Sequence, residues 1–146
     1  MDYAFDYAKA NKMDTESDYP YKGKDATCAA KGTIDMVASY EDVTPEDPEA
    51  LATALENGPV SVAVDGASLA FQFYFGGIVK HFCGTSLDHG VLLVGSGKEG
   101  DQDYWIIKNS WARRWGQNGF GYVQISEGKG VCGINQFVSG PNTVAL

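Results

Sequence analysis

The chain of 146 residues contains only three cysteines and two histidines, so few side chains are available for metal chemistry. His81, Cys83 and His89 lie close together in sequence, but they lack the paired ligand spacing of a structural zinc site. The sequence therefore predicts no metal site. Because the number of cysteines is odd, one of them has no internal partner if the protein works in an oxidising compartment.

Long apolar runs and positive charge are also scarce. No segment approaches the roughly 20 apolar residues of a membrane-spanning helix. The first residues include Asp2, Asp6 and Lys9 and lack the apolar stretch of a secretory signal, so any targeting segment is expected to lie upstream or to have been removed. The net charge of −8 repels phosphate backbones. We therefore expect neither a membrane nor a nucleic acid as a partner.

Residues that can form a core are plentiful. The length fits one ordinary domain, and 44% hydrophobic residues with 12% aromatic residues are enough to build its interior. An aromatic helix is predicted to end near Asn11, and the polar residues 14–33 favour a loop. A second helix is predicted to begin at Asp47, which can cap free N–H groups, with Pro48 in its first turn and Gly58 as its stop.

The rest of the chain favours β-structure. Val60, Val62 and Val64 alternate with smaller or polar residues, which is the period of a strand. Ser68 can cap a short helix that continues through Tyr74. Three further β-rich runs, separated by glycine-rich turns, cover residues 91–94, 104–107 and 120–125. The pattern predicts an α+β fold with short helices at the edge of a β-rich unit.

The residues with the clearest chemical potential are His89, in an Asp-His-Gly run, and Asn109, which opens an Asn-Ser-Trp run. An imidazole and an amide can orient one another for acyl transfer. Cys28 is a poor candidate for the nucleophile, because no helix start points it toward His89 and the nearby Asp25 disfavours a thiolate. The plainer alternative is that His89 is a satisfied core histidine and Asn109 an ordinary turn residue.

These two motifs, together with other blocks in the same order, resemble a papain-like cysteine peptidase of the cathepsin L type. The resemblance extends over essentially the whole chain. The matching blocks are residues 1–8, 17–21, 58–64, 74–78, 86–95, 109–116 and 131–134.

The resemblance implies a fold in two parts. Residues 45–146 are expected to form the family's right-hand domain, an antiparallel β-barrel-like unit with short edge helices that carries the histidine and the asparagine. Residues 1–44 are expected to be a remnant of the helical left-hand domain. In the family, the nucleophilic cysteine precedes the histidine and asparagine by roughly 130–150 residues. That places it about 40 positions or more before Met1, outside this chain.

The resemblance also implies roles for the site residues. His89 is expected to act as general base and acid, Asn109 to orient its ring, and Trp111 to cover their contact, although a tryptophan there also suits core packing. No metal or organic cofactor is implied. The chain alone is expected to be inactive, with the missing N-terminal part of the same enzyme as its partner. A rival hypothesis is a non-catalytic truncated homologue that acts as a binding or self-assembling module.

Peptide or protein substrates are implied as well. The carbonyl of Asp88 is expected to bind the substrate backbone. Apolar residues around it favour a medium-sized aliphatic substrate side chain, although Phe137 has core packing as an equal alternative. The residues expected to line this specificity pocket are Ala63, Leu87, Gly90 and Phe137.

The cysteines and the compartment follow from the same resemblance. Cys83 and Cys132 are expected to form a disulfide, while the family partner of Cys28 lies in the missing N-terminal part. The parent enzyme is expected in a lysosome or vacuole, or to be secreted. Because a seam that normally meets the left-hand domain is left uncovered, we also expect the chain to form a concentration-dependent homodimer.

Two features depart from the family pattern. Ala112 replaces the glycine that usually follows Asn-Ser-Trp, and Arg113 and Arg114 place two positive charges on the loop beside the leaving-group side. The alternative for the two arginines is a simple solvated loop.

Overall fold

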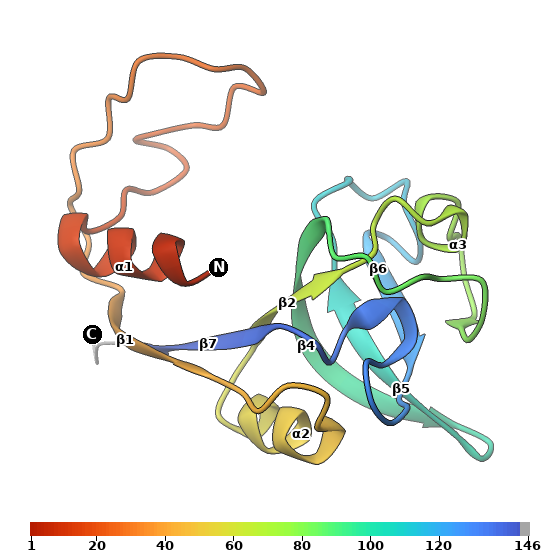
Figure 1. Cartoon of the computed structure of the whole chain (residues 1–146). Helices are drawn as coiled ribbons and strands as arrows, with labels where there is room; N and C mark the ends of the chain where they lie inside the picture. Colours follow the sequence, from red (N-terminus) through yellow and green to blue (C-terminus); the bar gives the residue numbers. More distant parts are fainter. Residues whose placement is uncertain (144–146) are drawn as a thin grey trace. The chain divides into compact units, whose positions relative to one another are not determined.

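The computed structural model describes residues 1–143 of the chain (Figure 1). Helix α1 spans Asp2–Asn11 and has Ala8 as its buried residue. The ring of Phe5 stacks on Tyr40 at 5.6 Å. This part belongs to the first of two compact units, which contains Met1–Glu41 and residues 141–143, and the second unit is Asp42–Gly140. Of the described residues, no helix is long and apolar enough to cross a membrane.

The polar loop after α1 is organised around Asp14. Its carboxylate accepts hydrogen bonds from the backbone N–H of Lys31 at 2.7 Å and from Thr33 Oγ1 at 3.2 Å. The hydrogen bond from the Lys31 N–H lowers the pKa of Asp14 from its ordinary value, because it stabilises the ionised carboxylate. A bridge between Met13 and Ile34 closes the loop at its base.

Helix caps fix the next two helices. Asp47 Oδ1 accepts hydrogen bonds from the N–H groups of Glu49 and Ala50, and α2 spans Pro48–Glu56 as predicted. Ser68 caps α3, which spans only Leu69–Gln72 and so ends before the predicted Tyr74. The chain leaves helical geometry at Phe73, and the hydroxyl of Tyr74 donates instead to the carbonyl of Gly77 at 2.6 Å.

The strands form one open sheet in the order β1-β7-β2-β4-β5-β6-β3. The strands are β1 (Val37–Asp42), β2 (Val60–Val64), β3 (Ile78–Val79), β4 (His89–Glu99), β5 (Gln102–Lys108), β6 (Phe120–Gln124) and β7 (Val138–Thr143). The prediction of an antiparallel barrel-like domain was wrong in two respects. The sheet is mixed, because β3 pairs with β6 in parallel. It also stays open, because β1 and β3 are its edges and a barrel needs its edge strands to pair.

The core of the second unit lies around β2, whose alternating valines are buried as the sequence pattern predicts. Leu93 of β4, Ile107 of β5 and Trp105 pack in the same cluster. A short 3₁₀ turn, Val131–Gly133, lies between β6 and β7 in the chain and brings Cys132 into this core. Residues 144–146, which the predicted right-hand domain includes, lie outside the described residues.

Candidate active site

Strand pairing brings His89 and Asn109 together. His89 is the first residue of β4, and Asn109 directly follows Lys108, the last residue of β5. These strands are antiparallel neighbours with Leu92 opposite Lys108, so the start of one lies at the same end of the sheet as the finish of the other. His89 Nε2 lies 2.9 Å from Asn109 Oδ1, although 20 residues separate the two in sequence.

The backbone of Ser110 determines how this contact is polarised. Its N–H donates to Asn109 Oδ1 at 2.7 Å, and an amide nitrogen could not accept that hydrogen bond. The amide oxygen therefore faces His89, and the imidazole must donate through Nε2. In the neutral ring this leaves Nδ1 as the free, basic nitrogen. The arrangement presents one proton acceptor, held in a single tautomer.

Aromatic side chains cover the pair. The ring of Trp111 stacks on His89 at 4.8 Å with an interplanar angle of 26°. Phe71 is 1% exposed and meets His89 and Trp111 edge-on at 6.0 and 5.5 Å. Trp115 Nε1 donates to the carbonyl of Phe71 at 2.9 Å, which anchors the cluster to α3. Asn109 is 8% exposed, and a hydrogen bond in a site of such low exposure is stronger than one in water.

The turn before α3 is fastened to the residue preceding the histidine. The carboxylate of Asp88 accepts hydrogen bonds from the N–H groups of Gly66 at 2.7 Å and Ala67 at 3.2 Å. Gly66 touches His89 so closely that a Cβ at this position would lie 2.6 Å from the Cβ of His89. A glycine is therefore required beside the imidazole.

The residues expected to line a specificity pocket gather around β2. Ala63 is paired with Gly90 across β2 and β4, and its N–H donates to the carbonyl of Phe137 at 3.0 Å. Leu87 lies two residues before His89 and is 37% exposed. A Cβ on Gly133 would come within 2.8 Å of Leu87 Cδ2, which places Leu87 against the turn before Phe137.

Two of the three cysteines are not available as a nucleophile. Cys83 and Cys132 are joined in a disulfide, and Cys132 is fully buried. Cys28 is free and exposed, and it belongs to the first compact unit, whereas His89 belongs to the second. Within residues 1–143, no group of three or more His, Cys, Asp and Glu residues could hold a metal ion.

The loop after Asn109 contains a strained residue. Ala112 has φ 61°, in the left-handed region where glycine has no steric penalty. This backbone geometry gives a physical reason for the glycine usual at the position. Arg113 and Arg114, which follow it, are both exposed.

Sequence reasoning singled out His89, Asn109 and Trp111, and it missed Gly66, Phe71 and Ser110. Gly66 carried a weak signal, because it opens a turn directly after a strand pattern. Phe71 carried none, because its role depends on which rings the fold brings next to it, and the role of Ser110 depends on how the side chain of its neighbour Asn109 is turned.

Comparison with known proteins places these features in a family. The profile of the papain family cysteine proteases matches residues 1–142. The probable cysteine protease RD21C of Arabidopsis thaliana is 45% identical over 97% of this chain, and the match covers 33% of that protein. The senescence-specific cysteine protease SAG39 of Oryza sativa subsp. indica is 45% identical over 92% of the chain, covering 41% of the relative. The chain thus spans 33–41% of the length of these relatives.

Solved structures agree. A cysteine protease of Carica candamarcensis has a TM-score of 0.88 at 34% identity, with 97% of this chain and 67% of that one covered. Digestive procathepsin L 3 of Tenebrio molitor has a TM-score of 0.89 at 39% identity, with 97% and 47% covered. The chain belongs to the papain family of cysteine proteases, and its relatives include plant and cathepsin L-like enzymes.

Proposed function

We propose that the whole protein is a cysteine-type endopeptidase, to which this chain contributes the general base and its orienting amide. The observation that carries the proposal is the 2.9 Å contact between His89 Nε2 and Asn109 Oδ1, with the amide oriented by the N–H of Ser110. A histidine whose second nitrogen is held by a third group is the arrangement that activates a nucleophile in catalytic triads. The thiol would come from a cysteine outside this chain.

In this mechanism Nδ1 of His89 takes the proton of the thiol, and the sulfur bonds to the carbonyl carbon of the scissile peptide. The protonated ring then gives its proton to the departing amine as the C–N bond breaks, leaving an acyl-enzyme. Water, deprotonated by the same nitrogen, attacks the thioester and releases the acid and the thiol. The hydrogen bond to Asn109 keeps Nε2 protonated throughout, so the other nitrogen carries every transferred proton.

The substrate would lie along the surface formed by Ala63, Gly90 and the backbone of Asp88. Ala63 and Leu87 offer an apolar surface to one substrate side chain, and Phe137, where its ring reaches the pocket floor, would favour medium aliphatic groups over aromatic ones. We place the whole enzyme in a vacuole or lysosome, or outside the cell. Its partners are peptide or protein substrates and the N-terminal part that carries the nucleophile.

The test combines this chain with the nucleophile-bearing segment of its parent protein. The 146-residue chain alone should not hydrolyse an aliphatic dipeptide substrate, whereas the complete protein should do so in a thiol-dependent reaction. His89→Ala should lower turnover by about 10⁴-fold or more, as expected for loss of a triad member.

The chain offers a matched control, since His81 is its only other histidine and is exposed. His81→Ala should leave turnover unchanged. An inactive complete protein, or equal losses for the two substitutions, would contradict the proposal and favour a non-catalytic binding module.

A further inference from the structure

The strand order places two chemically different surfaces on opposite sides of His89. Strand β4 lies between β2 and β5, so residues of β2 flank the histidine on one side and the loop after β5 flanks it on the other. The β2 side contains Ala63, paired with Gly90. The other side begins with Lys108 and continues through Asn109 to the loop with the two arginines. A peptide bound across His89 therefore has one end at the β2 surface and its other end at the loop with the two arginines.

The loop side is positively charged. Lys108, Arg113 and Arg114 are exposed, and none of them takes part in the ion pairs found among residues 1–143. Lys108 and Arg113 line a cavity of about 490 Å³ that also touches Asn109. The other residues that line it are Ala112, Asn118, Gly119 and Phe120, so no carboxylate faces the cavity.

The carboxylates near the histidine lie on the β2 side, and each already accepts hydrogen bonds from backbone N–H groups. The carboxylate of Asp88 accepts from Gly66 and Ala67, and that of Asp65 accepts from the N–H of Ser68 at 3.1 Å. The net charge of −8 works against an acidic ligand at long range. However, charges beyond roughly 8 Å are largely screened at physiological salt, so nearby cations dominate what a bound peptide experiences.

We propose that Arg113 and Arg114 are specificity-determining residues that select acidic side chains on the C-terminal side of the scissile bond, with Lys108 adding to the local field. The inference rests on the proposed function and refines its substrate class. If the apolar surface at Ala63 binds the acyl part of the substrate, the leaving part extends toward the loop. Guanidinium groups match carboxylates in geometry and can bind them with two parallel hydrogen bonds.

The experiment uses the complete protein and quenched fluorescent peptides with one aliphatic residue fixed before the scissile bond. Three peptides are compared, in which the three positions after the scissile bond are all Asp, all Gln or all Lys. The ratio of kcat/KM for the Asp and Lys peptides should be about three- to tenfold at low salt, as expected for exposed ion pairs, and should fall toward one in high salt. Arg113→Gln and Arg114→Gln should each reduce the ratio, and each should lower kcat/KM more for the Asp peptide than for the Gln peptide.

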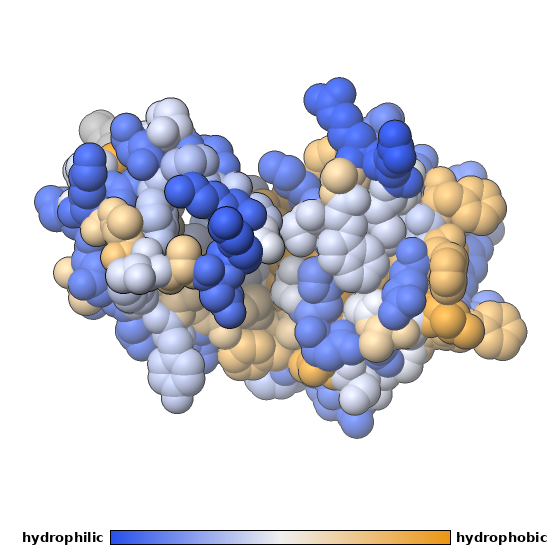
Figure 2. All heavy atoms as spheres, turned by 90° about the horizontal axis from the view of Figure 1, so that it is seen from above, coloured by the Kyte–Doolittle hydropathy of each residue, from blue (hydrophilic) through white to orange (hydrophobic). Residues whose placement is uncertain are grey.

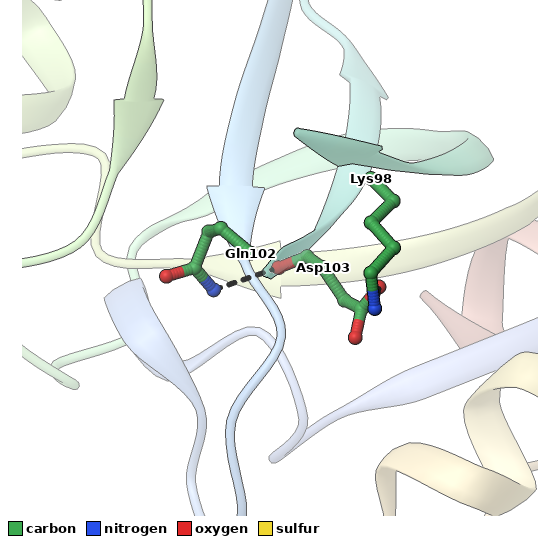
Figure 3. Close-up of polar contacts among 3 residues, drawn as sticks. All are labelled: Lys98, Gln102 and Asp103. Carbon is green, nitrogen blue, oxygen red and sulfur yellow. Dashed lines mark hydrogen bonds and ion pairs between the residues drawn. The ribbon is translucent and has the colours of Figure 1, made fainter. Parts of the chain in front are cut away.

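Lys98→Gln is the matched control. Lys98 pairs with Asp103 at 3.3 Å on the β4–β5 hairpin, where the side chain of Gln102 donates to the carbonyl of Asp103 (Figure 3). The substitution removes the same charge at a distance from the loop, and the ratio should not change. Hydrolysis of all three peptides at equal rates, or an equal effect of Lys98→Gln, would overturn the inference while the proposed function stands.

A binding measurement keeps the two proposals separable if no peptide is cleaved. Fluorescence anisotropy of a labelled Asp-Gly-Asp tripeptide with the 146-residue chain should show salt-sensitive binding that weakens in Arg113→Gln and Arg114→Gln. A Lys-Gly-Lys tripeptide that binds equally well would refute the inference directly.

Discussion

Removing the disulfide between Cys83 and Cys132 should destabilise the second unit strongly. The bridge closes a loop with a sequence separation of 49 residues. In the chain-entropy model, a loop of this size constrains the unfolded chain by about 4 kcal/mol at 25 °C. Domains of this kind are typically stable by only about 5–15 kcal/mol, so the double substitution Cys83→Ala/Cys132→Ala should remove a large share of the total.

Urea denaturation followed by tryptophan fluorescence measures the effect. With a slope of about 2 kcal/mol per M, a loss of about 4 kcal/mol moves the midpoint down by about 2 M. The site should respond too, because the carbonyl of Cys132 accepts from the N–H of Asp65 at 2.8 Å, next to the turn that packs against His89.

Cys28→Ser is the matched control, since Cys28 is free and exposed. This substitution should change the free energy of unfolding by no more than the scatter of surface substitutions, about 0.5 kcal/mol. Two results would refute the argument that the disulfide provides about 4 kcal/mol of stability. One is a loss of unfolding free energy below about 1 kcal/mol in the double variant, with the slope unchanged. The other is an equal loss in Cys28→Ser.

Four further predictions concern single features. Phe71→Ala should cost about 3–5 kcal/mol in urea denaturation, because the ring is fully buried, and it should loosen Trp111 over His89. Ala112→Gly should raise stability by up to about 1 kcal/mol by relieving the left-handed backbone at φ 61°, and a loss instead would show that the strain is absent. Because the pKa of Asp14 is lowered in the folded protein, its carboxylate contributes stability above the ordinary pKa of 3.8, and this contribution is lost as the pH falls through the folded pKa. Carbon NMR of Asp14 should show a titration midpoint below 3.8. Asp14→Asn should remove this part of the pH dependence of stability. Light scattering over a hundredfold dilution should show concentration-dependent association of the chain, because apolar side chains reach the surface (Figure 2), including Phe73, Phe75 and Phe82 at 72%, 87% and 95% exposure.

Much of the fold was predictable where the signal was local. The cap at Asp47 set the start of α2, and the alternating valines of β2 indicated a strand with one buried face. The edge strands β1 and β3 were missed for a physical reason, and β7 was missed as well. A strand of two residues such as β3 has no measurable period, and the partly exposed residues of β1 do not alternate cleanly between buried and exposed positions. The antiparallel, barrel-like prediction came from the family resemblance, and the parallel pairing of β3 with β6 and the unpaired edges β1 and β3 correct it.

The sequence by itself singled out the candidate residues for the proposed chemistry. The Asp-His-Gly and Asn-Ser-Trp runs were sufficient to single out His89, Asn109 and Trp111, because motif and order are properties of the chain alone. Only the tertiary structure decided how they act. The tautomer of His89 depends on the backbone N–H of Ser110, which orients the amide of Asn109. The stacking of Trp111 on His89 is supported by the edge contact between Trp111 and Phe71. The contacts of His89 with Asn109 and Phe71 join residues far apart in the chain, so their geometry exists only after β2, β4 and β5 have paired.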